Sequence, residues 1–248
     1  MILIKDLKYS YPESEEMAIS GISTRIKKGI TALMGKNGSG KTSLLKTIAG
    51  LIKPDDGKIE IDSERSVAFV PENPEDGFFE DTVMEEVEFF PKNLELNQEK
   101  RAKKALRDLD ILQLAGRSPF TLSAGEMRKV SIASVLSGNP GVMLLDEPVK
   151  SLHKEGENEI GKLLKKLKSS TEILLATHNS NFAYEFADNV HIMNEGKILA
   201  EGDAQSILSN QKLCRKGGLE IPDIVKWARS RGLEPPESFE KALEISRR

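Results

Sequence analysis

The chain has 248 residues, of which 30% are charged and 38% are hydrophobic, and its formal net charge is -3 at pH 7. This length suffices for one large domain or two smaller ones. The near-neutral charge excludes any bulk attraction to nucleic acid or to acidic membranes. The single cysteine, Cys214, cannot form an internal disulfide and indicates an unreactive thiol in a reducing compartment.

The sequence carries no signal for export or membrane insertion. Its N-terminus, MILIKDLKYSYP, alternates apolar with polar residues and becomes charged at once, so it lacks the apolar core of a signal peptide. No apolar run approaches the roughly 20 residues that a membrane-spanning helix needs. We therefore expect a cytoplasmic protein whose membrane role, if it has one, comes through a partner.

The first third of the chain shows strand patterns with one helix among them. Hydrophobic periodicity predicts strands at residues 2–8, 22–26, 30–34, 58–61 and 67–70, and a helix at residues 41–51. A Gly-rich turn lies between the strand at 30–34 and this helix. A strand, a glycine turn and a helix in this order are typical of a phosphate-binding site.

The middle of the chain changes to a helical pattern, and strands then return. Predicted helices occupy residues 82–90, 98–114 and 125–136; they are followed by strands at 142–145, 172–177, 190–193 and 197–200, with helices at 155–168 and 181–187 between them. Strands that alternate with helices imply a largely parallel sheet covered on both faces. After about residue 212 a short helical tail follows, with a last helix at 239–245.

The strongest motif is GKNGSGKT, which matches the phosphate-loop pattern G-x-x-x-x-G-K-[ST] between a predicted strand and a predicted helix. Glycines let successive backbone N–H groups turn toward phosphates, and the helix start adds its positive end. Lys41 would hold the β- and γ-phosphates, Thr42 would ligate Mg²⁺, and Ser43 would reach the α-phosphate. The nucleotide-binding residues predicted here are Gly35, Asn37, Gly38, Ser39, Gly40, Lys41, Thr42 and Ser43.

A second motif, VMLLDE, is a buried strand that delivers Asp146 at its C-terminal end, where ligands bind in open α/β sheets. Alone it is weak, because apolar strands often end in acidic turn residues. Together with the phosphate loop it makes Asp146 the expected Mg²⁺ partner and Glu147 the candidate base that polarises the attacking water.

The third motif, LSAGEMRKV, begins at Leu122, about 20 residues before Asp146. A Ser that opens a helix is usually no more than an N-cap. In this order and spacing, however, the three motifs resemble those of the ATP-binding cassette ATPases, whose usual signature is LSGGQ. The resemblance covers nearly the whole chain. It implies a P-loop NTPase core with a mostly parallel sheet, an N-terminal antiparallel β subdomain, an inserted α-helical subdomain at about 72–137 and a short helical C-terminal extension.

The same resemblance assigns further residues by position. Tyr11, in YSYP, matches the aromatic residue that stacks on adenine, and His178, in LLATHN, matches the switch histidine that contacts the γ-phosphate. A lone tyrosine near a strand end is otherwise mostly packing, and a lone histidine here would be a surface imidazole. Glu72 stands where the family usually has a glutamine that touches Mg²⁺ and water. It keeps an oxygen ligand but adds a negative charge close to the triphosphate.

The residues around Glu72 resemble those of one subgroup of the family. The stretch NPEDGFF followed by TVMEEV is similar to the ATPases of energy-coupling factor transporters, which import vitamins and metal ions such as cobalt and nickel. The tail, IPDIVKWARSRGLEPP, also resembles the C-terminal segment through which those ATPases pair. The expected domains are therefore an ATPase domain at 1–211 and an extension at 212–248 used in dimerisation. Expected partners are a second cassette ATPase, a transmembrane coupling subunit and a substrate-binding membrane protein, at the cytoplasmic face of the membrane.

Family cassettes work as head-to-tail dimers, so each chain also contributes residues to its partner's ATP. Ser123, Ala124 and Gly125, with the loop 151–153, are expected to face that second nucleotide. Two of these positions depart from the family pattern, because Ala124 replaces a glycine and His153 replaces an aspartate. Neutral drift in a homodimer is one explanation. We favour the other, in which this chain pairs with a related but non-identical ATPase.

Other classes of cassette ATPase fit less well. Those of DNA repair carry long coiled coils or zinc modules, but only about 80 residues separate Lys41 from Ser123, without heptads or CxxC. Translation-associated ATPases carry two cassettes on one chain, whereas this chain has one. A nucleotide-binding regulatory subunit with little turnover remains an alternative, although Glu147 argues against it. The basic cluster at 100–107 is interpreted as a solvated helix face rather than a nucleic-acid site.

Overall fold

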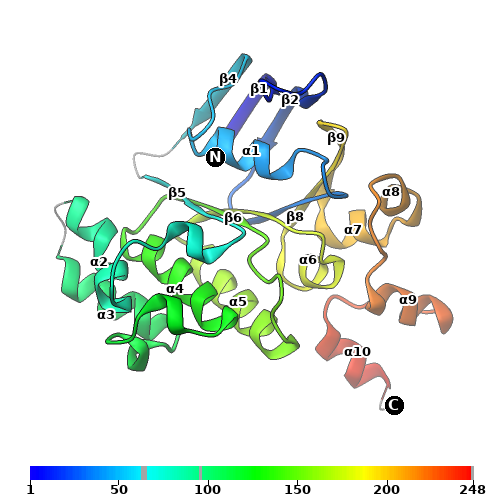
Figure 1. The fold of residues 1–248 in the computed structure, drawn as a ribbon. Coiled ribbons are helices and arrows are strands. Elements are labelled where there is room, and N and C mark those ends of the chain that lie inside the picture. Colours follow the sequence, from blue (N-terminus) through cyan, green and yellow to red (C-terminus); the bar gives the residue numbers. More distant parts are fainter. Residues whose placement is uncertain (63–65, 95–96, 247–248) are drawn as a thin grey trace. The chain divides into compact units, whose positions relative to one another are not determined.

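A computed structural model describes residues 1–62, 66–94 and 97–246 (Figure 1). The chain divides into two compact units, one made of Met1–Asp62 and Leu174–Arg248, the other of Ser63–Ile173. The first unit combines an antiparallel sheet with part of the parallel sheet, and the second combines two parallel strands with a group of helices. The structure thus has the expected α/β class, with a mostly parallel sheet and a separate antiparallel one.

The antiparallel sheet of the first unit has the strand order β2-β1-β4. Its strands are β1 (Ile2–Ser10), β2 (Met17–Ile26) and β4 (Asp56–Ile61). In β1, Ile2 and Ile4 are buried as the alternation predicts, and Leu7 is buried too because the register shifts at Asp6, which has a φ of 43°. All three strands are longer than the predicted segments.

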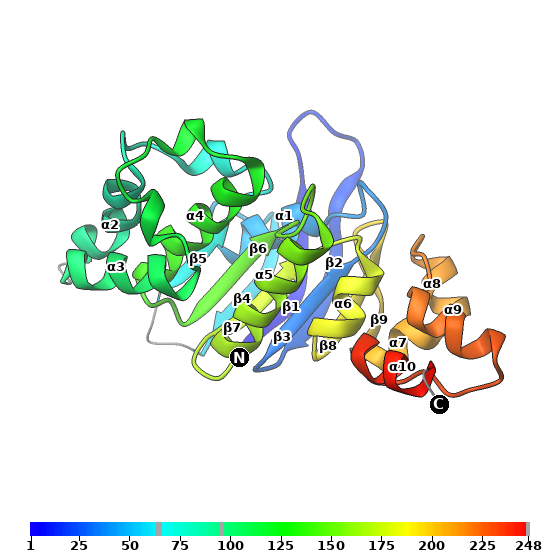
Figure 2. The same cartoon turned by 90° about the horizontal axis from the view of Figure 1, so that it is seen from below.

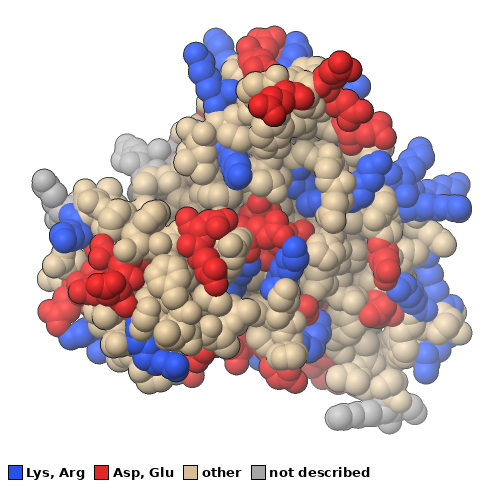
Figure 3. All heavy atoms as spheres, in the orientation of Figure 1, with Lys and Arg blue, Asp and Glu red and all other residues tan. Residues whose placement is uncertain are grey.

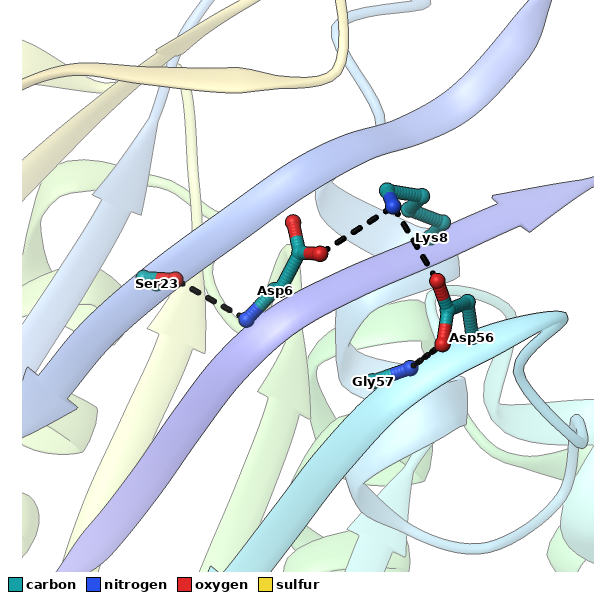
Figure 4. A network of polar contacts seen from close by, with 5 residues as sticks. All are labelled: Asp6, Lys8, Ser23, Asp56 and Gly57. Atoms are coloured by element: carbon teal, nitrogen blue, oxygen red, sulfur yellow. Dashed lines mark hydrogen bonds and ion pairs between the residues drawn. The ribbon is translucent and has the colours of Figure 1, made fainter.

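A polar network ties the exposed side of this sheet together (Figure 4). The Lys8 ammonium lies 3.1 Å from Asp6 and 3.0 Å from Asp56, so it bridges β1 and β4. These two carboxylates raise the pKa of Lys8 through hydrogen bonds and charge. The Asp6 N–H donates to the Ser23 hydroxyl at 2.9 Å, and the Gly57 N–H donates to the Asp56 carboxylate at 2.8 Å. The network thereby spans all three strands.

The parallel strands of the first unit are short, mostly apolar and largely buried. Strand β3 (Ile30–Met34) is buried at every residue and pairs in parallel with β8 (Asn189–Asn194), on which β9 (Lys197–Asp203) folds back antiparallel. Strand β7 (Glu172–Ala176) leads into this unit, and the Thr177 N–H donates to the Leu33 carbonyl at 3.0 Å. The adjoining helices are α1 (Lys41–Ile48) and α6 (Ser180–Phe186).

The C-terminal helices pack in the same unit. They are α7 (Ala204–Ser209), α8 (Gln211–Lys216), α9 (Asp223–Ser230) and α10 (Phe239–Ser246), and they lie beside β9 and α6 in Figure 2. The Tyr184 hydroxyl of α6 donates to the Pro236 carbonyl at 3.0 Å, and the Phe239 N–H donates to the Glu185 carboxylate at 2.9 Å. Cys214 is buried in α8, and burial raises the pKa of its thiol.

In the second unit, two strands support a helical group. Strands β5 (Val67–Val70) and β6 (Val142–Asp146) pair in parallel. The helices are α2 (Val83–Asn93), α3 (Gln98–Asp108), α4 (Ala124–Ser137) and α5 (Lys154–Leu167), of which the first three gather together in Figure 2. Helix α3 ends at Asp108 instead of the expected 114, because Asp110 has a φ of 56° and breaks the helical hydrogen bonding. A separate 3-10 turn, Leu112–Leu114, follows.

The surface agrees with the charge balance of the sequence. Acidic and basic side chains are interspersed on the face in Figure 3, without a broad area of one sign. Across residues 1–62, 66–94 and 97–246, no helix combines the length and apolar character that crossing a membrane requires.

Candidate nucleotide-binding site

The phosphate loop of the first unit joins β3 to α1. Strand β3 is buried throughout, so the loop begins at a fixed point, and Gly35, Gly38 and Gly40 all have a φ between 78° and 151°. A Cβ on Gly35 would lie 2.2 Å from the Met193 carbonyl oxygen, and one on Gly40 would lie 2.2 Å from that of Ala18. Only glycine therefore fits these two positions, which fixes the course of the loop.

The centre of the loop offers a cradle for an anion. A Cβ on Gly38 would meet no atom within 4 Å, so the backbone there faces open space. The Ser39 hydroxyl is buried and has no hydrogen-bond partner within the described residues. Helix α1 begins at Lys41; its N-cap residue, Gly40, offers no side-chain cap, and its first turn has no acidic residue. Its N-terminal N–H groups thus suit phosphate oxygens.

Lys41 and Ser43 lie in the first turn of α1, where the sequence motif predicts phosphate contacts. The Lys41 ammonium is nearly buried and donates to the loop carbonyls of Gly35 at 2.8 Å and Lys36 at 3.2 Å, so it lies along the loop. Ser43 Oγ is 3.1 Å from the Tyr11 hydroxyl, whose ring is 42% exposed. The structure therefore brings Tyr11 to the first turn of α1. Adenine stacking on Tyr11 stays a prediction.

His178 follows β7 and is exposed. Its neighbour Thr177 is fully buried and hydrogen bonds to Leu33, two residues before the phosphate loop. Thr177 also fixes the next turn, because its hydroxyl accepts the Asn179 N–H at 3.1 Å. His178 thus emerges at the same edge of the sheet as the phosphate loop. Its contact with a γ-phosphate stays a prediction.

Two supports of the phosphate loop were not predicted from the sequence. The Gly196 N–H, from the turn between β8 and β9, donates to the Ser39 carbonyl at 3.1 Å, and the Lys36 N–H donates to the Gly217 carbonyl at 3.2 Å. Glu195 and Gly196 both have positive φ, as a tight hairpin turn requires. The letters NEGK between two apolar runs were the only sequence signal for this turn.

The second unit carries the expected catalytic carboxylates at the end of β6. Asp146 is 2% exposed and Glu147 is 7% exposed. Glu147 has a φ of 46°, in a region that non-glycine residues seldom occupy and that is often found at functional sites. The chain turns directly after it, since the Lys150 N–H donates to the Glu147 carbonyl at 3.1 Å. The strand end and this turn hold both carboxylates in fixed positions.

Glu72 lies in the loop after β5, next to two cations. The Lys150 ammonium lies 2.5 Å from its carboxylate, and the Arg128 guanidinium donates to the backbone carbonyls of Pro71, at 2.8 Å, and of Glu72. Arg128 is 4% exposed. Burial lowers its pKa, while the charges of Glu72, Asp146 and Glu147 act in the opposite direction. The three acidic residues of the predicted site therefore share one electrostatic neighbourhood in this unit.

The signature segment opens α4 with a capping box. Ser123 Oγ donates to the Glu126 carboxylate at 2.7 Å, and the Ser123 N–H donates to the same group at 2.9 Å. These hydrogen bonds lower the pKa of Glu126. Ser123 and Ala124 are exposed, as residues that face another molecule must be. A Cβ on Gly125 would lie 3.5 Å from Leu152, so the signature and the loop 151–153 are neighbours.

His153 occupies the N-cap position of α5, but its side chain makes no capping hydrogen bond. An aspartate there would accept an N–H group of the first turn. Ser151, two residues earlier, has a φ of 64°. A backbone hydrogen bond shapes this loop, since the Leu152 N–H donates to the Val149 carbonyl at 3.2 Å, and the His153 side chain is exposed.

The residues fit a triphosphate and a hard cation. The open cradle at Gly38 and the unpartnered Ser39 hydroxyl suit phosphate oxygens. Within the described part of the chain, no three His, Cys, Asp or Glu side chains form a metal cluster. Mg²⁺ does not need one, since it binds through one or two protein oxygens together with substrate phosphates and water. Thr42 in the first unit and Asp146 in the second each carry an oxygen of this kind, and their binding of Mg²⁺ stays a prediction.

The fold and the phosphate loop define a P-loop nucleoside triphosphatase. A family model described as ABC transporter matches residues 19–150. The energy-coupling factor transporter ATP-binding protein EcfA of Carboxydothermus hydrogenoformans is 34% identical and covers 90% of this chain and 88% of its own. EcfA of Methanothermobacter thermautotrophicus is 32% identical over 94% of this chain and 82% of its own. The chain therefore belongs to the ABC transporter family.

Solved structures agree with this assignment. The structure of cbiO1 from Clostridium perfringens, part of the ABC transporter complex cbiONQ, has a TM-score of 0.77 at 30% identity and covers 92% of this chain and 98% of its own. A dimeric ATP-binding cassette in a post-hydrolysis state with ADP and Pi has a TM-score of 0.74 at 26% identity, over 82% of this chain and 99% of its own. This chain is thus an ATPase of the family, in which ATP hydrolysis is coupled to transport.

Proposed function

We propose that this chain is the ATP-hydrolysing subunit of an energy-coupling factor importer for vitamins or transition-metal ions. The observation that carries the proposal is the similarity to EcfA proteins over about nine tenths of the chain, combined with a complete phosphate loop and the Asp146–Glu147 pair. The importer would include a second cassette ATPase, a transmembrane coupling subunit and a substrate-binding membrane protein. The chain would work at the cytoplasmic face of the membrane.

In this proposal the phosphate loop binds the triphosphate of ATP, with Lys41 at the β- and γ-phosphates and Ser43 at the α-phosphate. Thr42, Asp146 and Glu72 would hold Mg²⁺, which neutralises charge developing on the phosphates. Glu147 accepts a proton from the attacking water, and His178 contacts the γ-phosphate. Burial of Glu147 and the fixed turn after it keep this carboxylate oriented without a large reorganisation.

The partner-facing residues lie on the second unit. Ser123, Ala124 and Gly125 would contact the ATP held by the other subunit, and His153 would lie beside them. The added methyl group of Ala124 and the missing carboxylate at His153 weaken that second site. These departures favour pairing with a related, non-identical chain, which would supply an intact signature to the ATP bound here.

The exposed end of the C-terminal extension suits a dimer contact. Helix α10 has no buried residue, and Leu243 and Ile245 are 59% and 43% exposed. The preceding segment is held to its own unit, because Gln205 donates to the Glu237 carbonyl at 2.8 Å. A tethered helix with an uncovered apolar side therefore supports the proposal that residues 212–248 take part in dimerisation.

Contact with the membrane subunit is assigned to exposed aromatic residues of the second unit. Phe79 and Phe120 are 74% and 55% exposed. Phe79 is held in place, since its N–H donates at 2.8 Å to the buried carboxylate of Glu86. Aromatic side chains on a fixed loop are typical anchors of protein interfaces. Phe79 lies seven residues after Glu72, so this part of the docking surface and the ATP site would share one segment.

The proposal is tested by purifying the tagged chain from detergent-solubilised membranes of its native host. We expect a second cassette ATPase and integral membrane subunits to copurify, and the assembly to bind a vitamin or a transition-metal ion. Phe79→Ser should reduce recovery of the membrane subunits while leaving ATP binding unchanged. Recovery of the chain alone, or with DNA-processing proteins, would contradict the proposed function.

A further inference from the structure

The charge of Glu72 is compensated within its own unit. A carboxylate at this position adds a negative charge beside Asp146 and Glu147, which is unfavourable for binding a triphosphate. The structure places the Lys150 ammonium 2.5 Å from the Glu72 carboxylate. The ion pair joins residues 78 positions apart, so it depends on the fold and not on local sequence.

The position of this ion pair in the fold says more about its role than its contribution to folding stability does. The side chains of Lys150 and Glu72 are 50% and 45% exposed, and such pairs contribute little to folding. The backbone of each partner, however, is attached to the predicted catalytic machinery. The Lys150 N–H donates to the Glu147 carbonyl at 3.1 Å, and the Glu72 carbonyl accepts from Arg128. The pair therefore connects the loop after β5 to the turn after the catalytic glutamate.

The number of charged groups around Glu72 supports the view that Lys150 compensates the charge of Glu72. Glu72, Asp146 and Glu147 carry three negative charges, and Arg128 and Lys150 carry two positive ones. Arg128 is buried and engaged with backbone carbonyls, so it holds the Glu72 loop in place. Lys150 is the cation that contacts the Glu72 carboxylate directly. Its removal would leave one positive charge against three carboxylates in this unit.

We propose that Lys150 is a positioning residue that neutralises Glu72 and orients its carboxylate, so that Glu72 is compatible with a bound nucleoside triphosphate. The inference rests on the proposed function, because it assigns Glu72 to the ATP site. It also explains how an acidic residue is tolerated at this position. Lys150 acts through Glu72 and is not assigned any contact with substrate.

The test is a double-mutant cycle on equilibrium binding of Mg·ATP and Mg·ADP by the full-length chain. Lys150→Met keeps the apolar stem and removes the charge, and it should weaken Mg·ATP binding about three- to tenfold, with a smaller effect on Mg·ADP. Adding Glu72→Gln should restore the affinity to within about twofold of the Glu72→Gln protein, because the cation and its partner carboxylate are then both removed and the local charge balance returns to that of the wild-type protein. Lys150→Arg should retain nearly full affinity.

A matched control separates this effect from a general loss of positive charge. Lys154 lies four residues further along, pairs with Glu157 at 3.0 Å and has a similarly exposed side chain. Lys154→Met should change the affinity less than about twofold. Added salt should reduce the difference between Lys150→Met and the wild-type protein, since screening weakens an uncompensated charge. A purely structural defect would not respond to salt in this way.

Two results would overturn the inference alone. One is equal affinity of the Lys150→Met and Lys154→Met proteins. The other is a Lys150→Met defect that Glu72→Gln does not relieve. In both cases the wild-type chain would still bind and hydrolyse ATP, so the proposed function would stand. Failure of the wild-type chain to bind Mg·ATP would overturn the proposed function and this inference with it.

Discussion

Replacing Gly38 by alanine should separate the binding role of the phosphate loop from its folding role. Gly38 has a φ of 78°, and a Cβ there would meet no atom within 4 Å. Gly50, just after α1, provides a matched control, with a φ of 73° and equally open surroundings. A Cβ at such a φ costs about 1–2 kcal/mol, and the less flexible unfolded chain recovers about 0.4–1 kcal/mol. Both variants should therefore lose about 1 kcal/mol of unfolding free energy.

Only the Gly38 variant should lose affinity for ATP. The open space at Gly38 is where the loop backbone must approach phosphate, so a methyl group there should weaken Mg·ATP binding by about tenfold or more. Thermal unfolding should show a fall in Tm of about 2–4 °C for each variant, and titration calorimetry should show normal binding only for Gly50→Ala. Equal affinities of the two variants, with equal stability losses, would refute the assignment of this loop to phosphate binding.

Two further predictions concern stability. His153→Asp should raise the unfolding free energy by about 0.5–1 kcal/mol in denaturant titrations, because it supplies the missing N-cap of α5; no change would show that the cap is already satisfied. Burial lowers the pKa of His191, although the Glu201 carboxylate opposes this, so the unfolded chain binds a proton first as pH falls below about 6.5. As the pH falls below this value, the unfolding free energy of the wild-type protein should decrease more steeply than that of His191→Gln, by up to about 1.4 kcal/mol per pH unit. Parallel pH profiles of the two proteins would contradict this.

Much of the fold was predictable because its parallel strands are short and mostly apolar. The segments 30–34 and 67–70 match β3 and β5 without error, since Gly29 and Gly35 bound the first run and Ser66 and Pro71 bound the second. Helix boundaries were less accurate. The prediction placed the end of helix α3 six residues too late, because the apolar spacing continues through Leu112 and Leu114 although the backbone turns at Asp110.

The candidate site was predictable where its residues are adjacent in sequence and not where they are distant. The phosphate loop and the VMLLDE strand end are local motifs with a direct physical meaning. Gly196 and Gly217 support the loop through backbone hydrogen bonds between residues that lie far apart in the sequence. The pairing of Glu72 with Lys150 has the same origin, and no periodicity or spacing signals it. The negative charge of Glu72 was therefore predictable from the sequence, whereas its partner was not.

Phosphate release by the purified assembly with Glu147→Gln tests the central claim most directly. The substitution keeps the size of the side chain but removes the group that accepts a proton from water. We expect the hydrolysis rate to fall about 100-fold or more, with Mg·ATP binding retained. Glu155→Gln, an exposed position in the first turn of α5, should leave the rate unchanged. An unchanged rate for Glu147→Gln would contradict the claim that this chain hydrolyses ATP through Glu147.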